Sequence, residues 1–461
     1  MNDNDAVARK DKAFLGHPIG LAWLSGSEFW ERFAYYGAQP LIALYISQYL
    51  LMPGHVEHVI GYGALKSFVE TFYGNLTPAQ FGIAISGIYT ALVYITPLLG
   101  GLVADRLIGR TPTVIIGAIA MAVGEFLMAL DAGFVVGLVM LVFGVGCFKG
   151  NIASQVGDLY SLEDKRRADA FLIYFMGIQL AAIITPLICG TLAQKVDWHL
   201  GFAAAGVGMT IGLVVYLFGR HTYPPEPLHT KSQTARPKLS GRGWTVIVLL
   251  VALLPVMALS MLGNQEIPGA YLIWGQKIFQ TTFFGFSMPI TWLVSIDAIV
   301  SAILMGGVIA FWRWWATHWR EPSELAKIIL GTSISALAPL LLAGAAAQNG
   351  ATGQQVSLAW AVGFHIVNDI GFSIALPMGI ALYSRIAPAG LGGVMIAVYY
   401  MSIAMCNLLT SKLGGWVTTM PGTQFWGLHT GLMAASAVIL IIVRALFGSI
   451  LAPAYDHLQP T

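Results

Sequence analysis

Residues 134–158, FVVGLVMLVFGVGCFKGNIASQVGD, decide the fold class of this chain. Apolar residues and glycine fill the stretch, which is long enough to cross a hydrocarbon core of ~30 Å as a helix. Similar stretches recur along the 461 residues, and only 10% of the chain is charged, against roughly 25% in soluble domains. So few charges cannot cover a globule in water. The composition predicts an all-α integral membrane protein and excludes a soluble enzyme, a disordered chain and a disulfide scaffold.

Twelve stretches of membrane-spanning length can be placed along the chain. They lie at roughly 18–50, 80–104, 112–131, 134–158, 169–194, 201–219, 244–265, 284–312, 325–347, 356–384, 391–414 and 426–449. Most of the 24 Lys and Arg residues fall on one side of the membrane if the N-terminus is cytoplasmic. Because Lys and Arg accumulate in cytoplasmic loops, we expect both termini inside. No cleaved signal peptide is expected after the polar residues 1–12.

One polar segment rich in proline and basic residues, 219–243, divides the spans into two sets of six. We therefore expect an N-terminal bundle at 1–218, a cytoplasmic linker at 219–243 and a C-terminal bundle at 244–461. Two six-helix bundles joined in this way describe the major facilitator fold, whose substrate site lies between the halves near the midplane.

The first span carries three charges that a membrane helix should not contain. Glu28, Glu31 and Arg32 lie in SEFWERFAYYG, followed by Tyr35 and Tyr36. A charge at the bilayer centre costs about 2.5–3.5 kcal/mol, so such residues are functional candidates. Glu28 and Arg32 are four residues apart and share a helix face. The alternative is an ion pair that only fixes helix packing, but three charges and two tyrosines in nine residues favour function.

The fourth span carries Lys149, nine residues before Asp158 at the predicted cytoplasmic end. This places Lys149 ~14 Å inside the helix end, so we expect it to face a cavity or a carboxylate. The alternative is a side chain that snorkels to water. Gly144 and Gly146 predict close helix contact rather than a dinucleotide site.

Several other intramembrane polar residues leave a choice between simple packing contacts and function. For Asp369, four residues after His365, packing and function are equally good interpretations. His429 is interpreted as a packed or interfacial histidine. The remaining candidates are Glu125, Glu266 and Asp297. The three cysteines, at 147, 189 and 406, show no paired spacing, so neither a disulfide nor a zinc site is predicted. No metal or organic cofactor is implied.

The charged and aromatic residues of the first span match a known pattern. Glu28 to Tyr36, EFWERFAYY, resembles the ExxERFxYY signature of the proton-dependent oligopeptide transporters, the POT or PTR branch of the major facilitator superfamily. The segment 100–110, with Asp105, Arg106 and Arg110, is similar to the family's cytoplasmic loop motif, which implies gating or structural roles for these three. Lys149 with Asn151 resembles the helix 4 motif, although Gly150 replaces the usual proline. The resemblance extends over nearly the whole chain, to 198–202 and to 284–295.

The chain also departs from the family pattern where a peptide's charged ends are held. Gln39 stands where an arginine usually helps to hold the peptide carboxylate, and Asn264 stands where its acidic partner is usual. Phe372 replaces the usual helix 10 glutamate, counted back from Pro377, and Gln179 replaces a helix 5 asparagine. The resemblance therefore implies an atypical member that lacks most of the charged side chains that usually hold the two ends of a zwitterionic peptide.

The sequence predicts a multi-pass transporter of the bacterial inner membrane, not an enzyme. We expect proton-coupled import of peptides or peptide-like small molecules by alternating access. The expected proton-coupling residues are Glu28, Glu31, Arg32, Asp369 and Glu266; the expected substrate-binding residues are Tyr35, Tyr36, Gln39, Lys149, Gln179, Asn264 and Phe372. Its partners would be the substrate, protons and lipid, with no nucleic acid.

Other readings remain open. One is a transporter of an amino-acid conjugate or of a nucleoside-like or cell-wall-derived compound. Another is a non-transporting sensor on the same fold, although such a protein would not need the intact Glu28, Arg32 and Lys149 set. A membrane enzyme would need a clustered nucleophile, base or metal triad at the water boundary, and the sequence suggests none.

Overall fold

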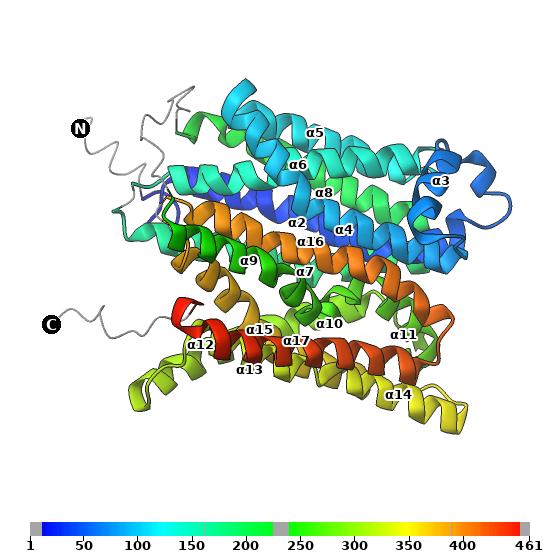
Figure 1. The fold of residues 1–461 in the computed structure, drawn as a ribbon. Coiled ribbons are helices and arrows are strands. Elements are labelled where there is room, and N and C mark those ends of the chain that lie inside the picture. The colour runs from blue at the N-terminus through cyan, green and yellow to red at the C-terminus, as the bar shows by residue number, and fades with distance from the viewer. Residues whose placement is uncertain (1–11, 162, 225–238, 389, 452–461) are drawn as a thin grey trace. The chain divides into compact units, whose positions relative to one another are not determined.

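The computed structural model describes residues 12–161, 163–224, 239–388 and 390–451. These residues are almost entirely helical (Figure 1). The chain divides into two compact units, Met1–Gln233 and Thr234–Thr461. The expected linker, 219–243, lies largely outside the described residues, between a helix that ends at Gly219 and one that begins at Gly241.

The N-terminal unit is a bundle of long helices joined by short turns. Its α-helices are α2 (Ile19–Tyr45), α3 (Tyr62–Tyr73), α4 (Pro78–Val103), α5 (Arg110–Met128), α6 (Phe134–Asp158), α7 (Arg166–Lys195) and α8 (Trp198–Gly219). Shorter helical turns are η1 (Ile46–Leu50), η2 (Val56–His58), η3 (Ala104–Ile108), η4 (Asp131–Gly133) and η5 (Arg220–Thr222). Helix α2 packs against α7, α8 and α4, so its charged face is enclosed by its own bundle.

Glycines allow α6 to approach its neighbours closely. A Cβ atom on Gly144 would lie 2.7 Å from the carbonyl oxygen of Gly117 on α5. One on Gly146 would lie 2.8 Å from Cβ of Thr96 on α4. Small residues at such crossings let helix backbones pack in contact. The predicted role of Gly144 and Gly146 in helix contact is confirmed.

The C-terminal unit is also helical but its helices are more often interrupted. Its α-helices are α9 (Gly241–Ser260), α10 (Leu262–Gln265), α11 (Leu272–Ile278), α12 (Trp292–His318), α13 (Glu324–Ser335), α14 (Ala338–Thr352), α15 (Ala359–Arg385), α16 (Gly392–Leu413) and α17 (Gly422–Leu451). The shorter turns are η6 (Ile267–Tyr271) and η7 (Gly414–Thr418), and β1 (Thr282–Phe283) pairs antiparallel with β2 (Phe286–Ser287).

Two predicted spans differ from the observed helices in instructive ways. The span expected from residue 284 begins instead at Trp292, because Phe284 and Gly285 take positive φ angles in the turn of the β1–β2 hairpin. The span expected at 325–347 is divided into α13 and α14, and α14 carries Pro339 in its first turn, a position that proline favours.

Eleven helices among the described residues are long and apolar enough to cross a membrane. Eleven of the twelve predicted spans overlap these helices. The remaining one, 18–50, corresponds to α2 and η1, where Glu28, Glu31 and Arg32 lower the apolar character. The prediction of an all-α membrane protein is confirmed.

Candidate functional site

The charged residues of α2 form one buried cluster. Nε of Arg32 lies 3.1 Å from Oε1 of Glu28 and also hydrogen-bonds Oε2 of the adjacent Glu31. The three side chains are 5%, 2% and 0% exposed, respectively. The predicted pairing of Glu28 with Arg32 across one helical turn is confirmed, and Glu31 joins it.

Only some of the polar atoms in this cluster are hydrogen-bonded. Oε2 of Glu28, Oε1 of Glu31 and Nη2 of Arg32 are buried and have no hydrogen-bond partner among the described residues. The guanidinium of Arg32 also lies 5.1 Å from the ring centre of Tyr35. One guanidinium therefore balances two carboxylates, and a proton on either acid would relieve the shared charge.

Lys149 on α6 belongs to the same electrostatic environment. Its side chain is half-buried, and Nζ lies 4.3 Å from the ring centre of Tyr94 on α4. Lys149 interacts electrostatically with Glu31, Arg32 and Glu28 without forming an ion pair with them. The direct contact of this ammonium is therefore with an aromatic face, and the expectation that it faces a cavity or a carboxylate stays a prediction.

Of the predicted substrate-binding residues of the N-terminal unit, Tyr35 lies against this cluster through its contact with Arg32. Tyr35 stacks on Tyr89 with ring centres 6.2 Å apart, and Tyr36 is half-buried beside it. Gln39 is buried and donates a hydrogen bond of 3.2 Å to Thr90. Gln179 on α7 is half-buried.

The predicted gating residues lie in and after η3. Nε of Arg110 is 3.6 Å from Oδ1 of Asp105, and its Nη1 pairs with Asp158 at the end of α6. Arg110 therefore ties the turn between α4 and α5 to the end of α6. Arg106 is exposed.

In the C-terminal unit, the predicted residues Asn264 and Glu266 lie at or next to the end of α10, in a row of side-chain hydrogen bonds. Gln265 donates to Asn264 at 2.9 Å and accepts from Asn407 on α16 at 2.8 Å. The next residue, Glu266, lies 2.9 Å from Nε2 of His429 on α17. Both side chains of that pair are buried, so His429 is packed inside the unit, as the sequence predicted as one of two possibilities, and it is also the partner of an acid.

The acid on α15 is also buried. Asp369 accepts a hydrogen bond of 3.1 Å from Asn368 at Oδ1, while its Oδ2 has no hydrogen-bond partner in the part of the chain that the structure describes. One turn before it, His365 bonds Asp297 of α12 at 2.7 Å. Phe372, three residues after Asp369, is half-buried. The C-terminal unit thus brings Asp369 near a histidine–aspartate pair.

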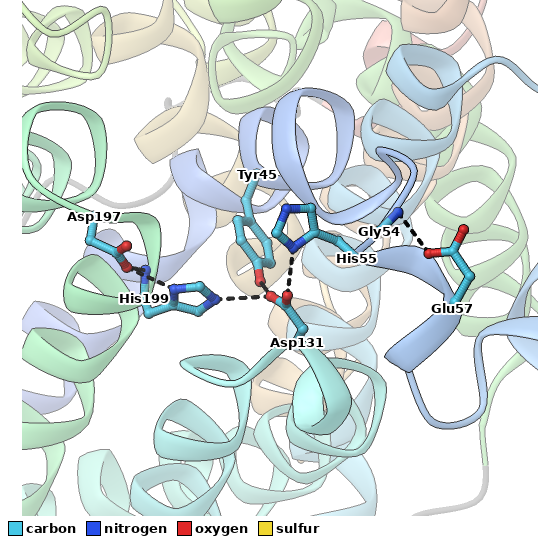
Figure 2. Close-up of polar contacts among 7 residues, drawn as sticks. All are labelled: Tyr45, Gly54, His55, Glu57, Asp131, Asp197 and His199. Carbon is cyan, nitrogen blue, oxygen red and sulfur yellow. Dashed lines mark hydrogen bonds and ion pairs between the residues drawn. The ribbon is translucent and has the colours of Figure 1, made fainter.

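A second polar cluster lies where several N-terminal helices begin and end, and the sequence did not predict it. Asp131 accepts from the hydroxyl of Tyr45 at 2.6 Å and lies 2.8 Å from His55 Nδ1 and 2.9 Å from His199 Nε2 (Figure 2). His199 Nδ1 in turn lies 2.7 Å from Asp197. The cluster joins the end of α2 to the starts of α6 and α8.

Sequence reasoning also missed or undervalued other residues around the α2 cluster. Tyr174 of α7 is buried and interacts electrostatically with Glu28, and the ring of Tyr94 faces the ammonium of Lys149. Glu125 of α5 is fully buried, and within the described ranges neither of its carboxylate oxygens has a hydrogen-bond partner. A usable signal was the presence of an uncompensated acid in an apolar span, which applies to Glu125 as it does to Asp369.

Comparisons with known proteins agree with the residue pattern. Residues 111–240 match the POT family (PTR2). The chain is 26% identical to a di-/tripeptide transporter of Lactococcus lactis subsp. cremoris, with 95% of this chain and 97% of that protein covered. It is 27% identical to the uncharacterized transporter YclF of Bacillus subtilis (strain 168), with 92% and 94% covered.

Solved structures give the same fold. A peptide transporter POT in complex with sulfate has a TM-score of 0.80 and 24% identity, covering 98% of this chain and 100% of that one. A POT family transporter in complex with 5-aminolevulinic acid has a TM-score of 0.76 and 21% identity, covering 94% and 97%. The predicted resemblance to the POT family and the major facilitator fold are confirmed.

Proposed function

We propose, from the match of residues 111–240 to the POT family and the similarity of nearly the whole chain to known transporters, that the protein is a proton-coupled symporter. It would import peptides or peptide-like small molecules across the bacterial inner membrane by alternating access, with both termini in the cytoplasm. The similar proteins are named as transporters, which supports transport rather than catalysis. The observation that carries the proposal is the buried set of Glu28, Glu31 and Arg32, with the half-buried Lys149 in the same bundle.

The cluster suits proton coupling because its cation cannot give up its charge. Arg32 stays protonated, so the state of the cluster changes only when Glu28 or Glu31 takes a proton. A protonated acid no longer needs the guanidinium, which then weakens one set of contacts relative to another. Lys149, which makes no ion pair with the cluster, is free to meet an anionic group of the substrate.

The proposal is tested in proteoliposomes with a chemically mixed library under an inward proton gradient. Glu28→Gln and Glu31→Gln should each reduce gradient-driven uptake more than counterflow exchange, because counterflow needs no net proton movement. Tyr49→Phe, outside the cluster, serves as the control variant. Wild-type gradient-driven uptake in both glutamine variants would contradict the role of the cluster.

We infer the substrate class from the residues at the positions where the family usually holds the charged ends of a peptide. A dipeptide is a zwitterion, and desolvating its ends is costly unless an anion and a cation meet them. Gln39 is already engaged with Thr90 and offers only an amide, and Phe372 offers no charge. We therefore propose a preference for a larger or less zwitterionic anion that uses Lys149 and aromatic side chains.

This preference has its own test. Simple dipeptides such as dialanine should be transported weakly or not at all, and Gln39→Arg with Phe372→Glu should raise dialanine binding. Tight, saturable, proton-driven uptake of dialanine by the unmodified protein would contradict it. A non-peptide substrate, such as an amino-acid conjugate, a nucleoside-like compound or a cell-wall-derived compound, is the second candidate. It is favoured by the same neutral positions, and the library screen distinguishes the two.

A further inference from the structure

His365 lies at the centre of a hydrogen-bonded chain that crosses three elements of the C-terminal unit. Its Nδ1 is 2.7 Å from Oδ1 of Asp297 on α12, and its Nε2 is 3.0 Å from the hydroxyl of Tyr271 at the end of η6. The imidazole is fully buried, whereas Asp297 keeps 18% of its side chain exposed. The chain therefore runs from a partly accessible carboxylate to a fully enclosed ring.

Asp297 and Tyr271 can hydrogen-bond both the neutral and the protonated ring of His365 without any heavy atom moving. In the neutral ring, Nδ1–H donates to the Asp297 carboxylate and Nε2 accepts the hydroxyl hydrogen of Tyr271. When Nε2 gains a proton, it donates to the oxygen of Tyr271, whose hydrogen rotates away. The charge of the imidazolium then lies beside the Asp297 carboxylate, which stabilises it.

The other buried histidine–carboxylate pair of this unit has no such freedom. Nδ1 of His429 lies 2.9 Å from the carbonyl oxygen of Phe425, which can only accept, so Nδ1 carries a hydrogen. Nε2 lies 2.9 Å from a carboxylate oxygen of Glu266, so a proton must lie between these two atoms. Both side chains are at most 1% exposed. This pair already holds its proton, whereas the His365 chain can accept one.

The groups around His365 favour an added positive charge. Asp369, one turn along α15, is buried with an unpartnered Oδ2. From the packed elements, α12 contributes Asp297 and η6 contributes Tyr271, while α14 has no titratable residue. The other charged groups of α13 and α15 are already paired: Lys327 with Glu321, which precedes α13, and Arg385 with Glu324. The titratable residues of α16 are Tyr399, Tyr400, Cys406 and, in its last turn, Lys412.

We propose that His365, with Asp297 and Tyr271, is a proton-binding site of the C-terminal unit that takes up and releases one proton at Nε2. The inference rests on the proposed proton-coupled function and adds to it a second site, on a histidine rather than on the acids of α2. Asp297 balances the charge, and the Tyr271 hydroxyl changes from donor to acceptor. The unpartnered oxygen of Asp369 marks a neighbouring position for the same proton.

The site is tested by ¹⁵N NMR of histidine-labelled full-length protein in liposomes, without substrate, between pH 5 and pH 9. Of the ten histidines, the one lost in His365→Gln identifies the site, and His429→Gln is the matched control that should leave that signal in place. We expect His365 to be an imidazolium at pH 5 and neutral at pH 9. In Asp297→Asn the imidazolium fraction of this residue at intermediate pH should fall about tenfold or more.

A His365 signal that keeps one form from pH 5 to pH 9, neutral or charged, overturns the proposal. If His365→Gln does not fold, Tyr271→Phe provides the assignment, because it removes the partner of Nε2 and shifts that resonance alone. The titration needs no transported compound. A protein that transports nothing would therefore refute the proposed function without affecting this result, and a static His365 would refute the site without affecting uptake.

Discussion

The two units of the chain stabilise buried acids in different ways. In the N-terminal unit, Glu28 and Glu31 share the guanidinium of Arg32. In the C-terminal unit, Asp297 and Glu266 each pair with a histidine. Arginine is permanently charged, whereas histidine changes charge near neutral pH. A proton entering the first arrangement must bind a carboxylate, whereas in the second it can reside on the base.

The units also share one feature. Each contains a fully buried acid with unpartnered oxygen: Glu125 on α5 and Asp369 on α15. A buried carboxylate oxygen without a donor is costly, and adding a proton is the simplest way to reduce that cost. The difference between the units therefore lies in the cation that each supplies, and this difference should appear in the stability of variants that remove the cation.

The largest loss of stability is expected from Arg32→Ala. It leaves Glu28 and Glu31 buried without their cation, and breaking a buried pair in this way costs about 3–5 kcal/mol. Unfolding of the purified full-length protein in mixed micelles measures the change in the free energy of unfolding. Adding Glu28→Gln and Glu31→Gln to Arg32→Ala should recover part of the loss, because no unpaired charge then remains. A loss below about 1 kcal/mol, the size of an ordinary surface effect, would contradict this account.

His429→Gln should cost less than Arg32→Ala. When the imidazole is removed, Glu266 can keep the shared proton and remain a neutral acid, so what is lost is one buried hydrogen bond, about 1–3 kcal/mol. Glu266→Gln is the matched variant, and its loss should be similar. A loss for His429→Gln as large as that for Arg32→Ala would show that the two units hold their acids in the same way.

The sequence predicted the N-terminal arrangement better than the C-terminal one, for a physical reason. Glu28 and Arg32 are four residues apart on one helix, so the helical period alone brings them together. His365 and Asp297, or His429 and Glu266, are brought together only by the packing of separate helices. A charged residue in an apolar span could be identified from the sequence, but its partner on another helix could not.

The same limit applies to the fold. Long apolar stretches predicted the helices because length and composition are local properties. The interruptions were not predicted, because they depend on turn geometry, as at the β1–β2 hairpin, and on how helix ends are packed. The cluster around Asp131 was missed because its members come from four separate turns and helix ends.

A smaller loss is expected from Asp131→Asn, in the cluster of Figure 2. Asp131 accepts from Tyr45 and holds His55 and His199, but 19% of its side chain is exposed, so solvent screens these interactions. We expect a loss of about 1 kcal/mol. Asp197→Asn is the control and should change little, because that side chain is 51% exposed. Equal losses for the two variants would show that the cluster acts only as a solvated surface network.

The smallest effect on stability is expected from Lys149→Ala, although its effect on transport should be large. Lys149 is half-buried and rests on the ring of Tyr94 without an ion pair, a contact worth about 0.5–1 kcal/mol. Removing it leaves no acid without its direct partner, because Glu28 and Glu31 keep Arg32. An uncommitted ammonium in a membrane bundle is available to an anion of the substrate. Lys149→Ala should therefore lose no more than about 1 kcal/mol of stability yet lose concentrative uptake of the compound found by the library screen, and Lys149→Arg should retain part of it. Normal transport by Lys149→Ala at normal abundance would show instead that this side chain only reaches towards water, and the N-terminal unit would then act through Arg32 and its two acids alone.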